Sequence, residues 1–184
     1  MMGDKRGNFG LLGRRIAAYL LDILILFGIL APTGQIILRL FDAAAPRTGP
    51  EIARVILWNF SLPVWFYFIL SDHSASGATA GKRLLRIQVC TVNGERLSIR
   101  RALARTAVKL LPWELVHVSA FALATDLSRF SPTQAVGLIA ANLLTAVYLG
   151  ITVATRGRRS AHDYVAGTFV RPTSARNQAS KGES

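Results

Sequence analysis

The sequence predicts an all-α integral membrane protein, a four-helix transmembrane bundle with a short cytoplasmic hairpin and an amphipathic interfacial helix. Of its 184 residues, 51% are hydrophobic and 17% are charged, whereas about 25% of the residues in a soluble domain are charged. The net charge is nevertheless +12. An apolar chain whose few charges are mostly positive is typical of a membrane protein, and it disfavours a nucleic-acid partner. The single cysteine excludes an internal disulfide framework.

Four apolar stretches predict the membrane spans, at about residues 16–38, 53–70, 110–126 and 134–154. A helix needs roughly 17–25 residues to cross the hydrocarbon core. We interpret the first stretch as a span rather than a cleaved leader, because it is long and Arg39 follows it before the small residues where a leader would be cut. The third stretch is a weaker candidate, since it carries Pro112, Glu114 and His117.

The positions of the cations predict the topology. Lys and Arg stay on the cytoplasmic side during insertion, and most of the 22 lie before the first span, between the second and third, or after the fourth. We therefore expect a protein of the plasma (inner) membrane with both termini cytoplasmic, and the heavy use of Ala and Arg indicates a bacterial source. The chain divides into a cytoplasmic N-terminal segment (1–13), a transmembrane domain (14–171) that includes the cytoplasmic loop (71–109), and a disordered tail (172–184).

The cytoplasmic loop holds two further predicted elements. Alternating apolar residues before the Asn93-Gly94 dipeptide predict a β-hairpin over residues 85–97 with a tight turn. Residues 98–111 predict an amphipathic helix. Its cations recur on one face, at Arg101, Arg105 and Lys109. Such a face suits the anionic headgroups of a lipid bilayer. A basic face that is simply solvated, on a helix that continues into the third span, fits the same pattern equally well.

Motifs for catalysis, metals and cofactors are incomplete in this sequence. The Gly77–Lys82 segment has one residue too few between its glycines for a phosphate-binding loop, and Arg83 stands where Ser or Thr is needed. The three histidines have no ligand spacing. Ser71–His73 contains the residue types of a catalytic triad, but adjacency in sequence is not triad geometry. We expect no enzyme activity, no cofactor and no metal.

Asp22 is the residue that the first span least favours. An aspartate deep in a membrane helix costs about 2.5–3.5 kcal/mol, so it needs a partner or a proton. Arg15 lies seven residues earlier on the same helix face, about 10.5 Å along the axis, so the two side chains border one polar pocket. Ala18 between them allows another backbone to approach. Two roles stay open for Asp22, a structural link to a neighbouring helix and a part of a transport or protonation path.

Other polar residues in the spans are candidates for contacts inside the bundle. Asn59 lies in the second span and Asn142 in the fourth. Glu114 and His117 lie three residues apart in the third, where they form either a proton-exchanging pair or an interfacial hydrogen bond. Polar side chains at such positions are expected to hydrogen-bond across helices.

Several segments occur together in an order that resembles a known family. They are Arg15–Asp22, Thr79–Val89, the Asn93-Gly94 turn, the region of Arg105, and Arg159–Thr168. Over about residues 10–170 the chain resembles the RDD family of membrane proteins. The family is named for one arginine and two aspartates, which match Arg15, Asp22 and Asp163. Arg86 stands where the family commonly has a small residue such as glycine, which puts the local backbone turn in question.

The resemblance implies a multi-pass membrane domain for which ligand or ion transport has been suggested. It also nominates Asp163 as a companion of Arg15 and Asp22. We therefore predict a charged network at the cytoplasmic ends of the helices, in which Asp163 meets Arg15, Lys82 or Arg83. Buried charges of this kind persist only when they are paired with one another. Such a network would serve as a cytoplasmic gate or as a passive clasp.

Two functions of different classes follow from these observations. The first is transport of a proton, a cation or a small ligand. Because four spans make a small bundle, this function calls for a homo-oligomer or a partner membrane protein. The alternative is a non-catalytic assembly or scaffold subunit of a larger membrane complex.

Overall fold

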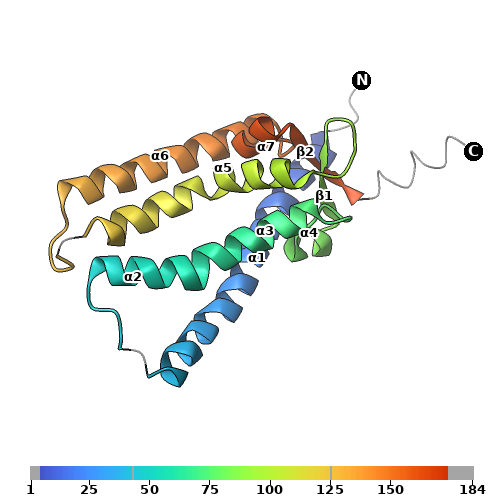
Figure 1. Cartoon of the computed structure of the whole chain (residues 1–184). Helices are drawn as coiled ribbons and strands as arrows, with labels where there is room; N and C mark the ends of the chain where they lie inside the picture. The colour runs from blue at the N-terminus through green and yellow to red at the C-terminus, as the bar shows by residue number, and fades with distance from the viewer. Residues whose placement is uncertain (1–4, 43, 125, 174–184) are drawn as a thin grey trace, which may run out of the picture.

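The computed structural model describes residues 5–42, 44–124 and 126–173, with side chains from residue 10 onward, and these are mostly helical (Figure 1). In chain order the elements are α1 (Lys5–Leu40), α2 (Gly49–Ile56), the π-helical turn η1 (Leu57–Ser61), α3 (Leu62–His73), α4 (Ala80–Leu84), β1 (Ile87–Thr91), α5 (Ile99–His117), the π-helical turn η2 (Val118–Ala122), α6 (Pro132–Ala154), α7 (Ala161–Ala166) and β2 (Thr168–Pro172). The predicted tail lies almost entirely outside the described residues.

Helix starts follow from the local sequence. α2 begins after Thr48, whose side chain forms a reciprocal capping box with Glu51, and α6 begins after Ser131 in the same way with Gln134. α2, η1 and α3 continue into one another without a break, as α5 and η2 do. Pro63 near the start of α3 has no backbone N–H to donate, and it follows the π-helical turn, where the helical ladder is already irregular.

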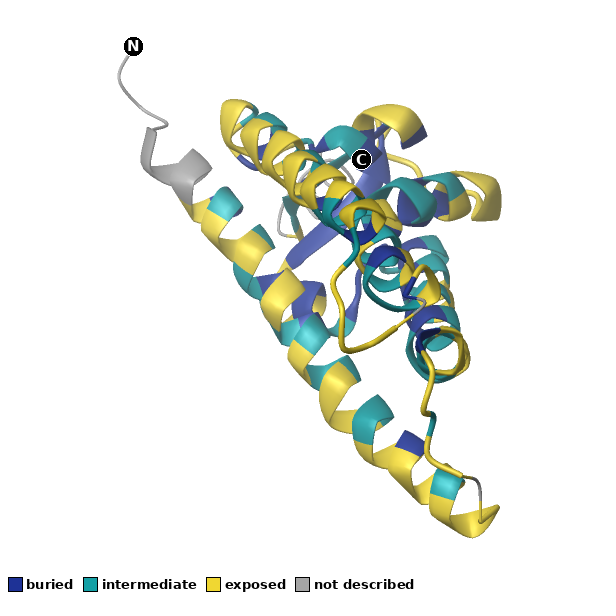
Figure 2. Ribbon diagram, turned by 90° about the vertical axis from the view of Figure 1, so that its left-hand side faces the viewer, coloured by how far each residue is buried: buried dark blue, intermediate teal, exposed yellow. Residues whose placement is uncertain are grey.

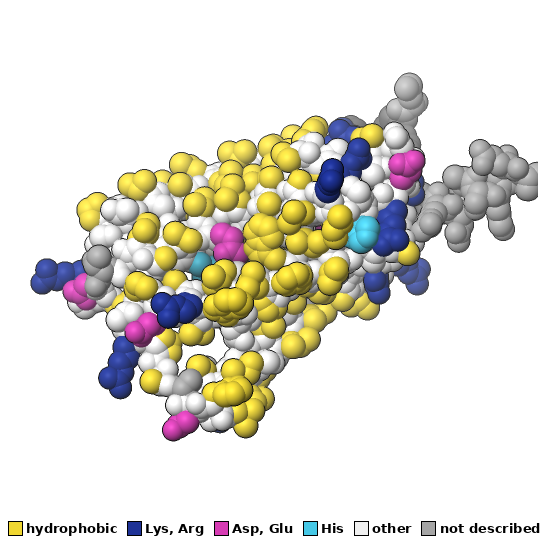
Figure 3. Space-filling model, viewed as in Figure 1, with side chains coloured by type: hydrophobic (Ala, Val, Ile, Leu, Met, Phe, Trp, Pro, Cys, Tyr) yellow, Lys and Arg dark blue, Asp and Glu magenta, His cyan; other side chains and the backbone are white. Residues whose placement is uncertain are grey.

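Three helices are long and apolar enough to cross a membrane, by length and composition: Gly10–Leu40, Gly49–His73 and Pro132–Ala154. Their large apolar side chains, such as Leu24, Val136 and Leu143, lie on the outer surface, and Figure 3 shows hydrophobic side chains along the helices. A soluble monomer rarely exposes so much apolar surface. The predicted third span falls in α5 and η2, which pack beside α3 and α6. A count of four spans stays a prediction.

One end of the molecule holds the small elements. α4, β1, β2 and α7 gather there around the beginnings of α1 and α5, while the far half of α1 diverges from the other helices (Figure 1). Figure 2 shows that buried residues concentrate near the strands, whereas the far part of α1 is mostly exposed. The apolar core at this end consists of Leu11, Ala18, Ile87, Val89, Leu97 and Val170. We call this the clustered end; its placement in the cytoplasm stays a prediction.

The predicted hairpin over residues 85–97 is wrong. β1 pairs antiparallel with β2 from the C-terminal region, with Val89 opposite Val170. The Asn93-Gly94 turn does form, with Gly94 at a φ of 79°. The chain then enters α5 at Ile99, and residues 95–98 between the turn and the helix form no strand. The strand partner therefore comes from the far end of the sequence.

The segment over residues 98–111 is not a separate interfacial helix, and it continues into the predicted third span as the alternative interpretation expected. It is the first part of α5, and it packs against α7 and α3. Its inward face carries Ala102 and Arg105, which are at most 1% exposed, whereas Ile99 and Leu103 are nearly half exposed. Thr106 and Leu110, further along the helix, are buried as well, so the segment has no single apolar face on its outside, and the charge of Arg105 is satisfied inside the protein.

Candidate functional site

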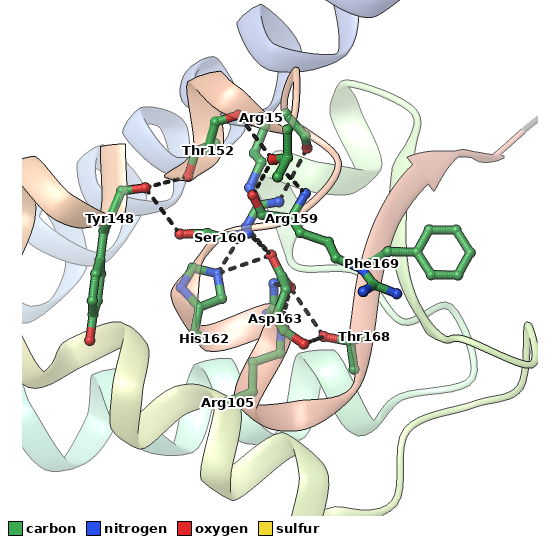
Figure 4. A network of polar contacts seen from close by, with 12 residues as sticks. Arg15, Arg105, Tyr148, Thr152, Arg159, Ser160, His162, Asp163, Thr168 and Phe169 are labelled. Atoms are coloured by element: carbon green, nitrogen blue, oxygen red, sulfur yellow. Dashed lines mark hydrogen bonds and ion pairs between the residues drawn. The ribbon is translucent and has the colours of Figure 1, made fainter. Parts of the chain in front are cut away.

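Five buried or nearly buried charged side chains meet at the clustered end, and we call them the ion cluster. Arg105 on α5 is its centre, since its Nε donates to Oδ1 of Asp163 at 3.0 Å and its Nη1 pairs with Asp72. Arg15 on α1 pairs with the other oxygen of Asp163. Lys82 on α4 donates from Nζ to Oδ1 of Asp72 at 2.7 Å. The cluster thus links α1, α3, α4, α5 and α7, and Figure 4 shows its Asp163 side.

Asp163 is held in place by its own local structure. It is the third residue of α7, where its carboxylate accepts the backbone N–H of Ser160 at 2.9 Å and the hydroxyl of Thr168 at 3.1 Å. Burial raises the pKa of this carboxyl, but the charges of Arg105 and Arg15 outweigh that effect and hold the pKa well below its usual range. Asp163 is therefore a permanent anion at physiological pH.

Asp22 occupies a separate site that we call the Asp22 cradle. Its Oδ1 accepts the hydroxyl of Tyr67 at 2.6 Å and the backbone N–H of Gly81 at 2.8 Å, and its Oδ2 accepts the hydroxyl of Thr79 at 2.6 Å. A side chain at position 81 would collide with the backbone oxygen of Ala18, so glycine is needed for this close approach. The small residue at position 18 thus allows the approach that the sequence predicted.

His162 lies beside the ion cluster. Arg15 donates to its Nε2 at 2.9 Å, so the hydrogen of the neutral ring lies on Nδ1. Burial lowers the pKa of His162 well below its ordinary value, and the nearby arginines add to the effect while Asp163 opposes it. The ring is therefore neutral at physiological pH, and Figure 4 shows it beside Asp163. Its buried Nδ1 finds no hydrogen-bond partner in the described part of the chain.

A cavity of about 360 Å³ adjoins both sites, and we call it the polar cavity. Its walls come from α1, α4, α5 and α6 and from the segment at the start of α7. The charged side chains that line it are Arg15, Lys82, Arg105, Lys109 and Asp22. Its apolar wall includes Ile16, Leu20, Pro112, Val116 and Leu149. Among the residues that the structure describes, no three His, Cys, Asp or Glu side chains gather as a metal site would require.

A family model described as the RDD family matches residues 9–167. The chain belongs to the RDD family. No curated protein and no solved structure matches it significantly. In this RDD protein Arg15 and Asp163 form a direct ion pair, whereas Asp22 lies in its own hydrogen-bonded site. The three residues that matched the family's name therefore divide between two sites.

The predicted charged network is present in part in this RDD protein. Arg15, Lys82 and Asp163 belong to the ion cluster, although Lys82 pairs with Asp72 rather than with Asp163. Arg83 is exposed and instead donates from Nε to the backbone oxygen of Ala78 at 3.1 Å. Sequence reasoning missed two members, Asp72 and Arg105. The involvement of Asp72 could have been predicted, because it lies at the end of the second span, where a charge needs a partner.

Two of the predicted bundle contacts connect helices. Asn59 donates from Nδ2 to the backbone oxygen of Leu30 on α1 at 3.2 Å. Glu114 accepts the hydroxyl of Ser61 and the indole N–H of Trp65, both at 3.0 Å. These bonds join α1 to η1, and α5 to η1 and α3. They lie away from the ion cluster, and none of these side chains lines the polar cavity.

The other two polar residues do not make the predicted contacts. His117 stacks edge-on against Trp113, with ring centroids 4.4 Å apart, while Glu114 is bonded elsewhere. A Glu114–His117 proton pair is therefore not formed. Asn142 is exposed and donates to the backbone oxygen of Leu138 on its own helix at 2.8 Å. Among the described residues it makes no hydrogen bond to another helix.

The three cations predicted to bind lipid headgroups do not share one surface. Arg101 is exposed, Arg105 is buried in the ion cluster, and Lys109 is half-buried. The prediction is wrong for Arg105, because both of its partners are carboxylates inside the protein. Lys109 turns inward, with its Nζ 3.1 Å from the ring centroid of Phe68. It faces the polar cavity rather than the outside.

Proposed function

We propose that this RDD protein transports a small ligand and that the polar cavity is its binding site. The observation that carries the proposal is a cavity of about 360 Å³ that is lined by charged groups and by apolar side chains of the long helices. Sites for small molecules usually have volumes of about 300–1,000 Å³, mostly apolar walls and a few oriented polar groups.

The lining favours a small ligand over a proton or a metal cation. Four cationic side chains and one carboxylate line the polar cavity, and the two carboxylates of the ion cluster still leave the formal charge positive, so a cation would meet net repulsion. The one carboxylate, Asp22, already accepts three hydrogen bonds from neutral donors. The expectation of a homo-oligomer or a partner membrane protein stays part of the proposal, and the mass of the complex in mild detergent tests it.

The scaffold function is the second candidate, and the ion cluster favours it. This cluster fastens five helices together, as a passive clasp would. A pure scaffold does not require an accessible cavity. Access to the polar cavity therefore discriminates between the two functions.

Cysteine labelling in membranes tests that access. In a Cys90→Ala background, Thr145→Cys places a thiol on the cavity wall, and Val147→Cys places one on the outer face of the same helix. Maleimides react with the thiolate, which forms in water and not in lipid. We expect a charged maleimide to label Thr145→Cys much faster than Val147→Cys. Equal, slow labelling of both would contradict the proposal and favour the scaffold function.

Transport of protons or cations is tested in liposomes that enclose a pH-sensitive dye. We expect no dye response when a Na⁺ or K⁺ gradient is imposed on the reconstituted protein. A response that disappears in Asp22→Asn would replace the small ligand with a proton or cation as the transported species.

A further inference from the structure

Lys109 differs from the other cations of the polar cavity. Its ammonium group lies 3.1 Å from the ring centroid of Phe68 and 5.0 Å from that of Tyr19. Within residues 10–173, apart from the two undescribed positions, it forms no ion pair and no hydrogen bond. The other three lining cations are each paired with a carboxylate. A cation held against two aromatic faces inside a cavity is thus available to an anion.

The charge balance at the clustered end also calls for an anion. The ion cluster contains three cations and two carboxylates, and Lys109 and Asp22 add one charge of each sign. His162 is neutral. One positive charge is therefore left over when Lys109 is protonated, and burial without a paired carboxylate lowers the pKa of Lys109 well below its ordinary value. A monoanionic group beside Lys109 would balance it.

The same cavity also has apolar lining residues. They include Ile16 and Leu20 of α1, Val116 of α5 and Leu149 of α6. Leu20 and Leu149 are both more than half exposed, so this flank is continuous with the outer apolar surface. α1 packs mainly against α4 rather than α6, which leaves the two helices apart here. A hydrocarbon chain can leave the cavity by this side and enter the lipid.

Two further lining side chains carry polar hydrogens that the protein does not use. Nε1 of Trp113 and Nδ1 of His162 are buried and find no hydrogen-bond partner among the described residues. Both residues line the polar cavity. Such donors are costly when unpaired, and these two lie behind the cavity wall without accessible surface of their own.

We propose that the polar cavity binds an anionic amphiphile, with a phosphate-like or carboxylate headgroup beside Lys109 and an apolar chain that leaves between α1 and α6. This inference rests on the proposed function and names its substrate class. Headgroup and chain are both needed, because the cationic and apolar walls belong to one cavity. A free phosphate ion shares the headgroup chemistry but uses only half of the site.

Native mass spectrometry of the full chain in a neutral detergent tests the ligand class. The probes are dodecyl phosphate, a neutral dodecyl glycoside and inorganic phosphate. We expect one dodecyl phosphate to bind each protomer, the glycoside to compete poorly, and inorganic phosphate to bind at least about tenfold more weakly. Equal binding of the glycoside would overturn the need for an anion. Equal binding of inorganic phosphate would overturn the need for a chain.

Variants locate the site and separate this inference from the proposed function. Lys109→Gln should weaken dodecyl phosphate binding about tenfold or more, and Lys109→Arg should retain it. Arg101→Gln is the matched control, since Arg101 is an exposed cation of the same helix outside the cavity. Unchanged affinity in a folded Lys109→Gln would overturn the inference; should that variant not fold, the wild-type probe comparison decides.

A cavity-filling variant tests the proposed function independently of charge. Thr145→Trp should abolish binding of every probe, whereas Val147→Trp on the outer face should not. If Thr145→Trp binds dodecyl phosphate as the wild type does, the ligand lies elsewhere and the cavity has no part in transport. If Thr145→Trp blocks binding, but the neutral glycoside binds as well as dodecyl phosphate, the cavity is the binding site and only the requirement for an anionic headgroup is overturned.

Discussion

Asp163 and Asp22 are buried carboxylates at the same end of one molecule, yet their surroundings are opposite. Asp163 is neutralised by two arginines, whereas Asp22 is held by two hydroxyls and one backbone N–H. Ion pairs remove a charge from its surroundings, while neutral donors orient a carboxylate and leave its charge in place. The comparison teaches that the two family aspartates have different tasks. One fastens helices together, and the other contributes charge to a cavity wall.

The largest effect is expected for Asp163→Asn. The substitution leaves Arg15 and Arg105 buried with one carboxylate fewer, so the free energy of unfolding should fall by about 3–5 kcal/mol. Chemical unfolding in mixed micelles measures it. Asp126→Asn is the control, because Asp126 is exposed, and it should change stability by no more than about 0.5 kcal/mol. Similar losses in both variants would contradict the buried clasp.

A smaller effect is expected for Asp22→Asn. The amide keeps one acceptor oxygen for the Tyr67 hydroxyl and the Gly81 N–H, and no cation loses its partner. The same unfolding measurement should give a loss of about 1–3 kcal/mol, below that of Asp163→Asn. If both substitutions destabilise equally, the distinction between the two sites is lost.

Acidification should lower the stability of the protein through His162, which lies beside Asp163. Its pKa is lowered in the folded protein, and the unfolded chain binds a proton near pH 6.5, so stability falls as the pH drops below about 6.5. Below that value the loss should be about 1 kcal/mol per pH unit, and it should be smaller in His162→Gln, whose amide oxygen can still accept from Arg15. An identical pH profile in this variant would show that His162 does not titrate as described.

The smallest effect is expected outside both sites, at Arg86. This residue has a φ of 54°, in the left-handed region that favours glycine, and it follows the C-terminus of α4. Arg86→Gly relieves that strain but adds entropy to the unfolded chain, so stability should change by less than about 1 kcal/mol. A larger loss would mean that the Arg86 side chain supports the clustered end.

The sequence predicted those parts of the site that depend on local spacing or on the family resemblance. The Arg15–Asp163 pair followed from the resemblance, and the close approach at Ala18 followed from helix periodicity and a small side chain. The unusual backbone at Arg86 was also signalled, because glycine is common at that position of the family.

What the sequence could not predict depends on contacts between distant segments. Arg105 has the same helical spacing as the exposed Arg101, and only its carboxylate partners from α3 and α7 make burial favourable. The strand partner of β1 lies near the C-terminus, so the turn at Gly94 was mistaken for a hairpin. Local patterns determine where helices and strands form. They do not determine which face of a helix is buried or which strands pair.

Ligand protection of a cavity thiol tests the central claim most directly. The rate at which a charged maleimide labels Thr145→Cys, in the Cys90→Ala background, is measured with and without dodecyl phosphate. We predict fast labelling that dodecyl phosphate slows and a neutral dodecyl glycoside does not, with Val147→Cys slow throughout. Labelling of Thr145→Cys that is as slow as that of Val147→Cys, or that dodecyl phosphate leaves unchanged, would contradict a cavity built for an anionic amphiphile.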